Sequence, residues 1–197
     1  AAANYTFGYP TGTVTIQRKA AVITAASPSR TYGDAVPDIG WTYSSLANGE
    51  NGDDILTTAP TCGTTYTARS AFGTSPATTC SGAVAANYTF TYGAGAVTIA
   101  KRRITVTAAS PAVTYGDAIP SISPSYSDFQ NGETTDVVSG TSCSTTYTRT
   151  SAVATTPTTT CSGATAANYS FAYTDGTVSI QRKSLTITAS SPSVTFG

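Results

Sequence analysis

The chain has 197 residues, of which 10 are basic and 10 acidic, and it contains no histidine, so its formal net charge is zero. A neutral chain has no long-range attraction for nucleic acid or for an anionic membrane, which argues against both as partners. Apolar residues make up 40% and charged residues only 10% of the sequence, a composition that favours folded domains over disorder.

The sequence repeats itself. The word Asn-Tyr-Thr/Ser-Phe begins at Asn4, Asn87 and Asn168, so successive copies lie 83 and then 81 residues apart. A period of this length exceeds that of solenoid repeats and indicates independent domains in series. The register predicts four parts in chain order: the tail of one repeat at 1–19, complete repeats at 20–102 and 103–183, and the head of another at 184–197.

Each repeat begins with a predicted strand. Apolar residues alternate with Thr over Ile104–Ala108, and equivalent alternation occurs at 21–25 and 185–189. A period of two is typical of a half-buried strand. The end of one repeat, 177–183, continues into 184–189 without a Gly/Ser-rich or Pro-rich linker, so we expect successive modules to form a rod.

Two loops follow the first strand. Residues 32–37 and 115–120 contain Tyr-Gly-Asp and are predicted turns, in which Gly adopts a positive φ and Asp bonds nearby amides; a ligand loop is the alternative. The oxygens of Asn48–Asp54 could bind Ca²⁺, but they lack EF-hand spacing, so we favour a solvated loop. Residues 53–58 and 134–139 are predicted to form at most one helical turn.

The cysteines form one pair in each repeat, Cys62 with Cys80 and Cys143 with Cys161, each 18 residues apart. The intervening chain has the length of two short strands and a turn, so we predict a disulfide between neighbouring strands, which requires an oxidising compartment. On the chain-entropy description such a bond contributes about 3 kcal/mol. A zinc site is the alternative, but the sequence has neither His nor a Cys-x-x-Cys motif.

The end of each repeat is a predicted hairpin. Tyr88, Phe90 and Tyr92 alternate with polar residues, and Gly93-Ala94-Gly95 is expected to turn the chain into a second strand ending at Ile99, with equivalents at 5–16 and 169–180. The three Asn residues that begin these segments, Asn4, Asn87 and Asn168, each start an Asn-x-Ser/Thr triplet, which would accept a glycan in a eukaryotic secretory pathway. We favour the alternative, in which each Asn bonds its local backbone.

No catalytic, metal-binding or cofactor-binding residue is predicted. The chain has no histidine for acid and base catalysis, its carboxylates are scattered, and no nucleophile, zinc or nucleotide-binding motif occurs. No run of 18 apolar residues or secretion leader is visible in the sequence. We therefore predict a non-enzymatic protein without cofactors. The predicted disulfides indicate a location outside the cell or on its surface.

The order of these signals resembles that of the MBG-type tandem repeats of large bacterial surface adhesins. In the second repeat the resemblance is carried by four motifs: Ile104–Ala108, Tyr115–Pro120, Asn131–Glu133 and Asn168–Ile180. The resemblance extends over both complete repeats and both fragments. It implies a stalk or binding module of a secreted or surface-anchored protein, with glycan or mucin as one ligand class to test. The cysteine pair is an addition to this family pattern.

These observations predict an all-β fold of tandem immunoglobulin-like β-sandwiches, with β-grasp-like modules containing one short helix as the alternative. The leading function is a structural and adhesive spacer, whose partners are neighbouring identical repeats placed end to end. A second hypothesis is the repeating body of an extracellular filament. A third is a glycan-binding module in which exposed Trp41, Tyr43 or Tyr126 stacks on sugar, although Pro124 replaces Trp41 in the second repeat.

Overall fold

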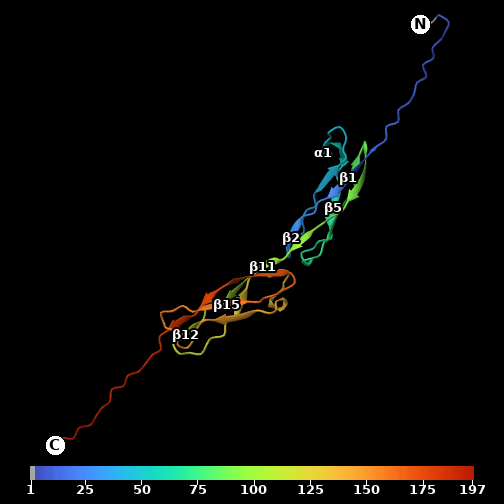
Figure 1. Cartoon of the computed structure of the whole chain (residues 1–197). Coiled ribbons are helices and arrows are strands. Elements are labelled where there is room, and N and C mark those ends of the chain that lie inside the picture. Colours follow the sequence, from blue (N-terminus) through green and yellow to red (C-terminus); the bar gives the residue numbers. More distant parts are fainter. Residues whose placement is uncertain (1–2) are drawn as a thin grey trace. The chain divides into compact units, whose positions relative to one another are not determined.

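The computed structural model describes residues 3–197 as two compact units of nearly pure β-structure (Figure 1). The first unit contains residues up to 30, 36–67 and 75–98. The second contains 99–197 together with two earlier segments, 31–35 and 68–74. The predicted all-β class is confirmed.

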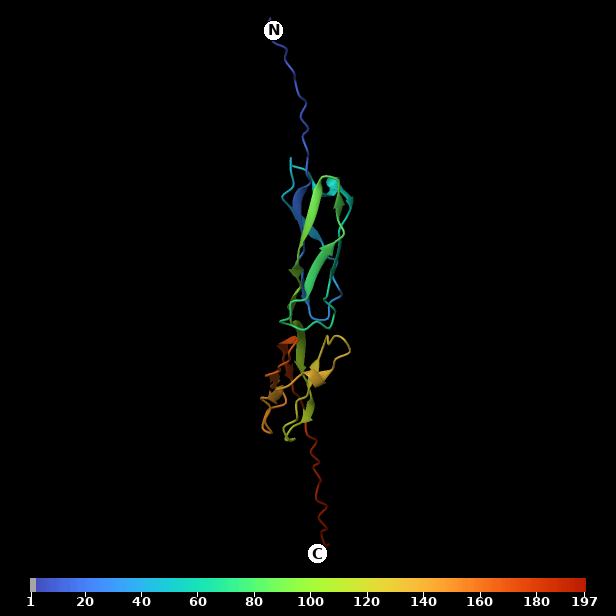
Figure 2. The same cartoon turned by 90° about the vertical axis from the view of Figure 1, so that its right-hand side faces the viewer.

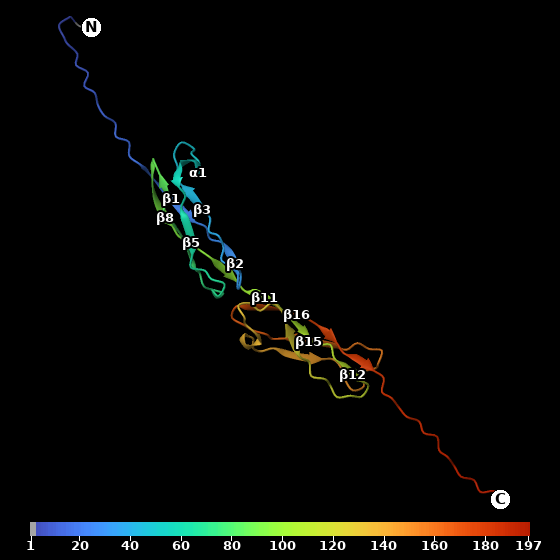
Figure 3. The same ribbon diagram turned by 180° about the vertical axis from the view of Figure 1, so that it is seen from behind.

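The first unit is built around strand β1, which has one antiparallel and one parallel neighbour. β1 (Lys19–Ala25) pairs antiparallel with β3 (Trp41–Ser44) and parallel with β8 (Tyr88–Gly93), as Figure 3 shows. The remaining strands form three small sheets: β5 (Thr61–Thr64), β6 (Ala77–Ser81) and β9 (Gly95–Ala96); β4 (Leu56–Thr58) and β7 (Val84–Ala85); β2 (Ser29–Thr31) and β10 (Thr98–Ala100).

The second unit repeats this topology except for the β4–β7 sheet, whose counterpart is a single bridge between Ser139 and Thr165. Its central strand β11 (Arg102–Ala108) pairs antiparallel with β13 (Pro124–Tyr126) and parallel with β16 (Tyr169–Thr174). Two further sheets complete it: β14 (Ser142–Thr145), β15 (Thr158–Ser162) and β17 (Gly176–Thr177); β12 (Ala112–Thr114) and β18 (Ser179–Gln181).

The core of each unit lies between its two three-stranded sheets. Ile23 and Ala25 on β1 pack against Cys80 on β6, and Val106 and Ala108 on β11 pack against Cys161 on β15. In both central strands every second residue is buried, which confirms the half-buried strand predicted from the alternating pattern. The alternation therefore selects the face that packs on the opposite sheet.

The hairpin predicted over 88–99 is wrong. After β8 the chain does not reverse: β8 pairs with β1, β9 with β6, and β10 with β2. Gly95 is required because two backbone segments approach each other closely here. A Cβ atom on Gly95 would lie 2.7 Å from the carbonyl oxygen of Ala25. The equivalent segment 169–180 crosses between sheets in the same way.

The acidic loops form one short helical turn each, but the turn predicted over 53–58 ends at Ile55, and residues 56–58 belong to β4. α1 (Gly52–Ile55) begins at Asn51, whose side chain accepts a hydrogen bond from the Asp53 amide, and lies at the end of the first unit where β1 begins (Figures 1 and 2). Its counterpart in the second unit is the 3₁₀ turn η1 (Thr135–Val137).

The strands predicted within 5–16 and 185–189 do not form. Residues 5–18 and 184–197 are extended and exposed, with no assigned strand. Alternation shows that a segment can pair, but a strand forms only where a neighbouring strand bonds to it.

The close approach at Gly95 gives a test with an internal control. Gly95→Ala should lower the free energy of unfolding by about 1–3 kcal/mol, because the new methyl group meets backbone that cannot move aside. Gly63→Ala, in β5, should be neutral or slightly stabilising, since nothing lies within 4 Å of its Cβ position. Denaturant unfolding of both variants measures the difference. Equal values would show that Gly95 is not required for the sheet crossing.

Candidate functional site

Both cysteine pairs form disulfides across neighbouring antiparallel strands. Cys62 on β5 lies directly opposite Cys80 on β6, and Cys143 on β14 lies opposite Cys161 on β15. Cys80 and Cys161 are buried in the cores of their units. Each disulfide therefore ties the second sheet together at the point where it packs on the first.

A second constellation in each repeat joins a tyrosine to a glutamate. Asn131 and Gly132 both adopt positive φ values, 58° and 76°, and this tight turn brings Glu133 to the start of β16. The hydroxyl of Tyr169 donates to the Glu133 carboxylate and accepts a hydrogen bond from the Gln130 amide at 3.1 Å. The Asn-Gly-Glu motif therefore forms a turn that places the Glu133 carboxylate beside the Tyr169 hydroxyl.

The first repeat builds the same pair. Asn48 and Gly49 have φ values of 57° and 70°, the Tyr88 hydroxyl donates to Glu50, and it accepts from the Ala47 amide at 2.9 Å. The hydrogen bond to Glu50 raises the pKa of Tyr88. Burial raises the pKa of Tyr169 to about 12, and the hydrogen bond to Glu133 adds to this effect.

In the second unit this pair is covered by the Tyr-Gly-Asp turn of segment 31–35. The Tyr32 hydroxyl donates to the other Glu133 oxygen at 2.9 Å, and its ring meets the Tyr169 ring edge to face with centroids 5.5 Å apart. Phe129 makes a second edge-to-face contact with Tyr169, also at 5.5 Å. Tyr32 is only 3% exposed.

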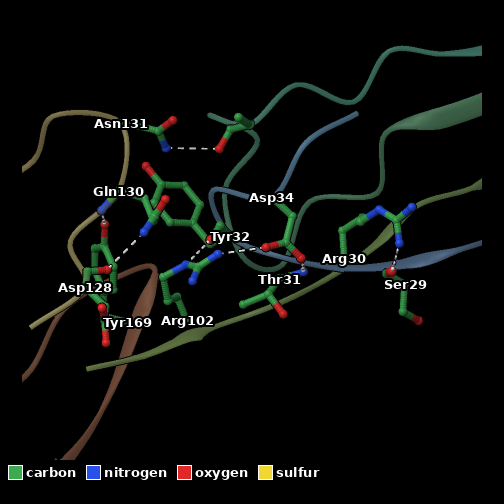
Figure 4. A network of polar contacts seen from close by, with 11 residues as sticks. Ser29, Arg30, Thr31, Tyr32, Asp34, Arg102, Asp128, Gln130, Asn131 and Tyr169 are labelled. Atoms are coloured by element: carbon green, nitrogen blue, oxygen red, sulfur yellow. Dashed lines mark hydrogen bonds and ion pairs between the residues drawn. The ribbon is translucent and has the colours of Figure 1, made fainter. Parts of the chain in front are cut away.

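A basic residue fixes the turn from the other side. Arg102 donates from Nε to the Tyr32 carbonyl at 2.8 Å and from Nη2 to Asp34 at 2.7 Å (Figure 4). The second Asp34 oxygen accepts from the Thr31 amide at 2.9 Å and so closes the turn. Gly33 has a φ of 88°, and a Cβ atom there would lie 2.6 Å from the Cβ atom of Gln130. Only glycine therefore fits this contact.

Segment 68–74 adds a second set of contacts. Asn131 donates to the Ala68 carbonyl at 3.0 Å, and Arg69 donates to the Asn131 carbonyl at 3.1 Å. The Asn168 side chain accepts from the Phe72 amide at 3.0 Å. The local backbone bond predicted for Asn168 is therefore wrong, because its partner lies 96 residues away in the sequence.

The residues proposed for sugar stacking are half-buried and hydrogen-bonded. Trp41 Nε1 donates to the Tyr43 hydroxyl at 2.7 Å, and the Tyr126 hydroxyl bonds Thr141 at 2.7 Å. Trp41, Tyr43 and Tyr126 all pack against the core clusters of their units. Over residues 3–197, no group of three or more acidic, Cys or His side chains is placed to hold a metal ion.

We did not predict from the sequence that four residues form one cluster: Tyr32, Arg102, Glu133 and Tyr169. A signal was present in the repeat register: Glu50 corresponds to Glu133, Tyr88 to Tyr169, and Lys19 to Arg102 and Lys183. Each of these positions keeps its chemistry in every copy, although the residues are far apart in the sequence.

Fold and site together define a tandem array of all-β modules, each closed by its own disulfide and each carrying a Tyr-Gly-Asp turn. The chain belongs to the MBG domain family of the YGX type, whose family description matches residues 21–98 and 104–179. The family predicted from the sequence motifs is thereby confirmed. No curated protein sequence matches the chain. Within residues 3–197 no helix has the length and apolarity needed to span a membrane.

Tyr32 and Tyr115 allow a matched test of the covered pair. Tyr32→Phe keeps the ring contact but loses the hydrogen bond to a carboxylate, which should cost about 1.5–3 kcal/mol of unfolding free energy in the second unit. Tyr115→Phe should change it by less than about 0.5 kcal/mol, because Tyr115 is 43% exposed. Urea unfolding of the whole chain distinguishes the two, and equal effects would contradict the assigned role of Tyr32.

The pKa of Tyr169 predicts a loss of stability in alkali. An unfolded tyrosine ionises near pH 10 and the folded Tyr169 near 12, so the folded state holds this proton more tightly. Its contribution is complete below about pH 10 and is lost as the pH rises toward 12. Unfolding free energies measured from about pH 9 to 11 should fall less steeply for Tyr169→Phe than for the parent chain. Parallel curves of unfolding free energy against pH for the two proteins would contradict the raised pKa of Tyr169.

Proposed function

We propose that this chain is a non-enzymatic structural segment, a stalk or spacer with an adhesive role in a long repetitive extracellular or cell-surface protein. The observation that carries the proposal is the repetition of one disulfide-closed MBG module, with the same pairing of its central strand and the same Tyr-Glu contact in each copy. Repetition of a module that keeps its internal contacts supplies length.

The position of the disulfides supports a mechanical role outside the cell. Cross-strand disulfides persist in oxidising compartments, which favours a secreted or surface location. Each bond closes a loop of 18 residues, so that this part of the chain cannot be extended when the module unfolds. A stretched module therefore retains a compact element from which it can refold.

A glycan-binding role is the second candidate, and one observation favours it. Gly40, Trp41, Tyr43 and Asp53 line an open groove of about 330 Å³ in the first unit. Aromatic rings beside a carboxylate are suited to sugar, but Pro124 replaces Trp41 in the second repeat, so the groove would serve one module only. Binding of the whole chain to a glycan array, with Trp41→Ala as the control, separates this role from a spacer role.

Force measurements test the spacer function directly. Pulling on the ends of the chain should give two separate unfolding events. Reduction of the disulfides should increase the extension gained in each event by about 60 Å, because 18 more residues at about 3.5 Å each can then be stretched. The Cys62→Ser/Cys80→Ser variant should lengthen only one event. Smooth extension without distinct events, before and after reduction, would overturn the spacer proposal.

A further inference from the structure

We propose that the groove beside Trp41 binds an amino sugar, a hexose whose ammonium group pairs with Asp53 while its ring lies against the aromatic side chains. This inference rests on the glycan-binding candidate, whose sugar class it names, and it does not depend on the spacer function. Four residues of the first unit line the groove, which has a volume of about 330 Å³: Gly40, Trp41, Tyr43 and Asp53.

The aromatic side chains of the groove come from one face of strand β3. Trp41 and Tyr43 are two residues apart, so both point to the same side of the strand, about 7 Å from each other along it. Both are half-buried, which leaves part of each side chain open to the groove. An aromatic ring presents an apolar surface with a negatively polarised face, which suits both the C–H groups of a sugar and a cation.

A row of hydrogen bonds leads along the groove to one carboxylate. Trp41 Nε1 donates to the Tyr43 hydroxyl at 2.7 Å, and this hydroxyl donates to Asp53 Oδ1 at a long 3.5 Å. The two aromatic donors are therefore used within the protein, and the group left for a ligand is an acceptor with a negative charge. A carboxylate has sites for about four hydrogen bonds, so Asp53 keeps capacity for a ligand.

The charge of Asp53 is not neutralised by a neighbouring cation. No Lys or Arg occurs between Arg30 and Arg69 in the sequence. Over residues 3–197, Asp53 makes no ion pair within 4 Å, and it is exposed. Asp54 in the same helical turn adds charge of the same sign. A groove that combines carboxylate charge with aromatic rings attracts a positively charged ligand.

The carboxylate is held in place before a ligand binds. The Asn51 side chain accepts a hydrogen bond from the Asp53 amide at 3.4 Å and caps α1. Gly52 is buried, and a Cβ atom there would collide with the Tyr43 ring. The helical turn therefore packs directly on Tyr43 and sets Asp53 beside it, which lowers the entropic cost of binding.

The groove is distinct from the surface on which another repeat packs. In the second unit, segments 31–35 and 68–74 are held by hydrogen bonds to four residues: Arg102, Asn131, Glu133 and Asn168. None of these is equivalent to a groove residue, because the counterparts of Trp41, Tyr43 and Asp53 are Pro124, Tyr126 and Asp136. The second unit thus keeps the tyrosine and the carboxylate but lacks the indole ring.

Titration of the whole chain with four tetramers tests this assignment. Trp41 is the single tryptophan of the chain, so its fluorescence reports on the groove. The ligands are the β-1,4-linked tetramers of glucosamine, N-acetylglucosamine and glucose, together with tetralysine, at about pH 6, where amines are protonated. We expect the glucosamine tetramer to bind at least about tenfold more tightly than the other three, because it alone combines sugar rings with ammonium groups.

Variants separate the two contacts and supply a matched control. Asp53→Asn should lower the affinity for the glucosamine tetramer at least about tenfold, to that of the N-acetylated tetramer. Asp136→Asn, the equivalent change in the second unit, should leave the affinity unchanged, because Pro124 stands there in place of the indole ring. Followed by calorimetry, Trp41→Phe should retain more of the affinity than Trp41→Ala.

The outcomes distinguish this inference from the functions on which it draws. Equal affinity for the glucosamine and N-acetylglucosamine tetramers, or unchanged binding by Asp53→Asn, would overturn the ammonium contact and leave a neutral-sugar site standing. Equal affinity for tetralysine would overturn the sugar contact. If no sugar binds, the glycan-binding candidate fails as well, while distinct unfolding events under force would still support the spacer function.

Discussion

The size of the core is the constraint on which the rest of the structure depends. Each unit buries only a few side chains between its sheets, such as Ile23 and Ala25 in the first. A domain of this size has only a few kcal/mol of stability to spare, so a disulfide worth about 3 kcal/mol is a large share of it. The disulfides lie in the cores themselves, where Cys80 packs with Ile23 and Cys161 packs with Val106.

The buried polar side chains in these cores have hydrogen-bond partners, because so small a core cannot compensate for an unpaired one. Thr78 and Thr159 are fully buried, and each donates to a backbone carbonyl at 2.8 Å. Every buried side-chain polar atom of residues 3–197 has a partner. An unpaired one would cost about 1–3 kcal/mol, comparable to the gain from the disulfide.

The sequence was sufficient for those features that depend on local pattern. Alternation identified the central strands, the 18-residue spacing indicated the cysteine pairs, and the acidic loop at Asp53 suggested a single helical turn. The crossing at 88–99 was missed because alternation shows which face of a strand is buried but not which strand lies beside it. We interpreted Gly93 and Gly95 as a turn. Glycine is instead needed at position 95 because a side chain would collide with the Ala25 carbonyl.

The Tyr-Glu cluster was missed for a different reason, since its members come from segments that only the folded chain brings together. The second compact unit includes segments 31–35 and 68–74, which the repeat register assigns to the preceding repeat. The sequence repeat and the compact unit therefore do not contain the same residues. The turn at Tyr32 is accordingly covered by residues of the next repeat, such as Arg102 and Glu133.

The contact that holds the Tyr32 turn depends on the chemistry of one residue. Arg102 donates from two nitrogens, one to the Tyr32 carbonyl and one to Asp34, because its guanidinium group presents donors in a fixed fork. Lys19 and Lys183 present a single ammonium group at the equivalent positions. A lysine can form the ion pair at this position but not the planar two-donor contact that Arg102 makes. The two side chains are therefore not equivalent there, although both are cationic.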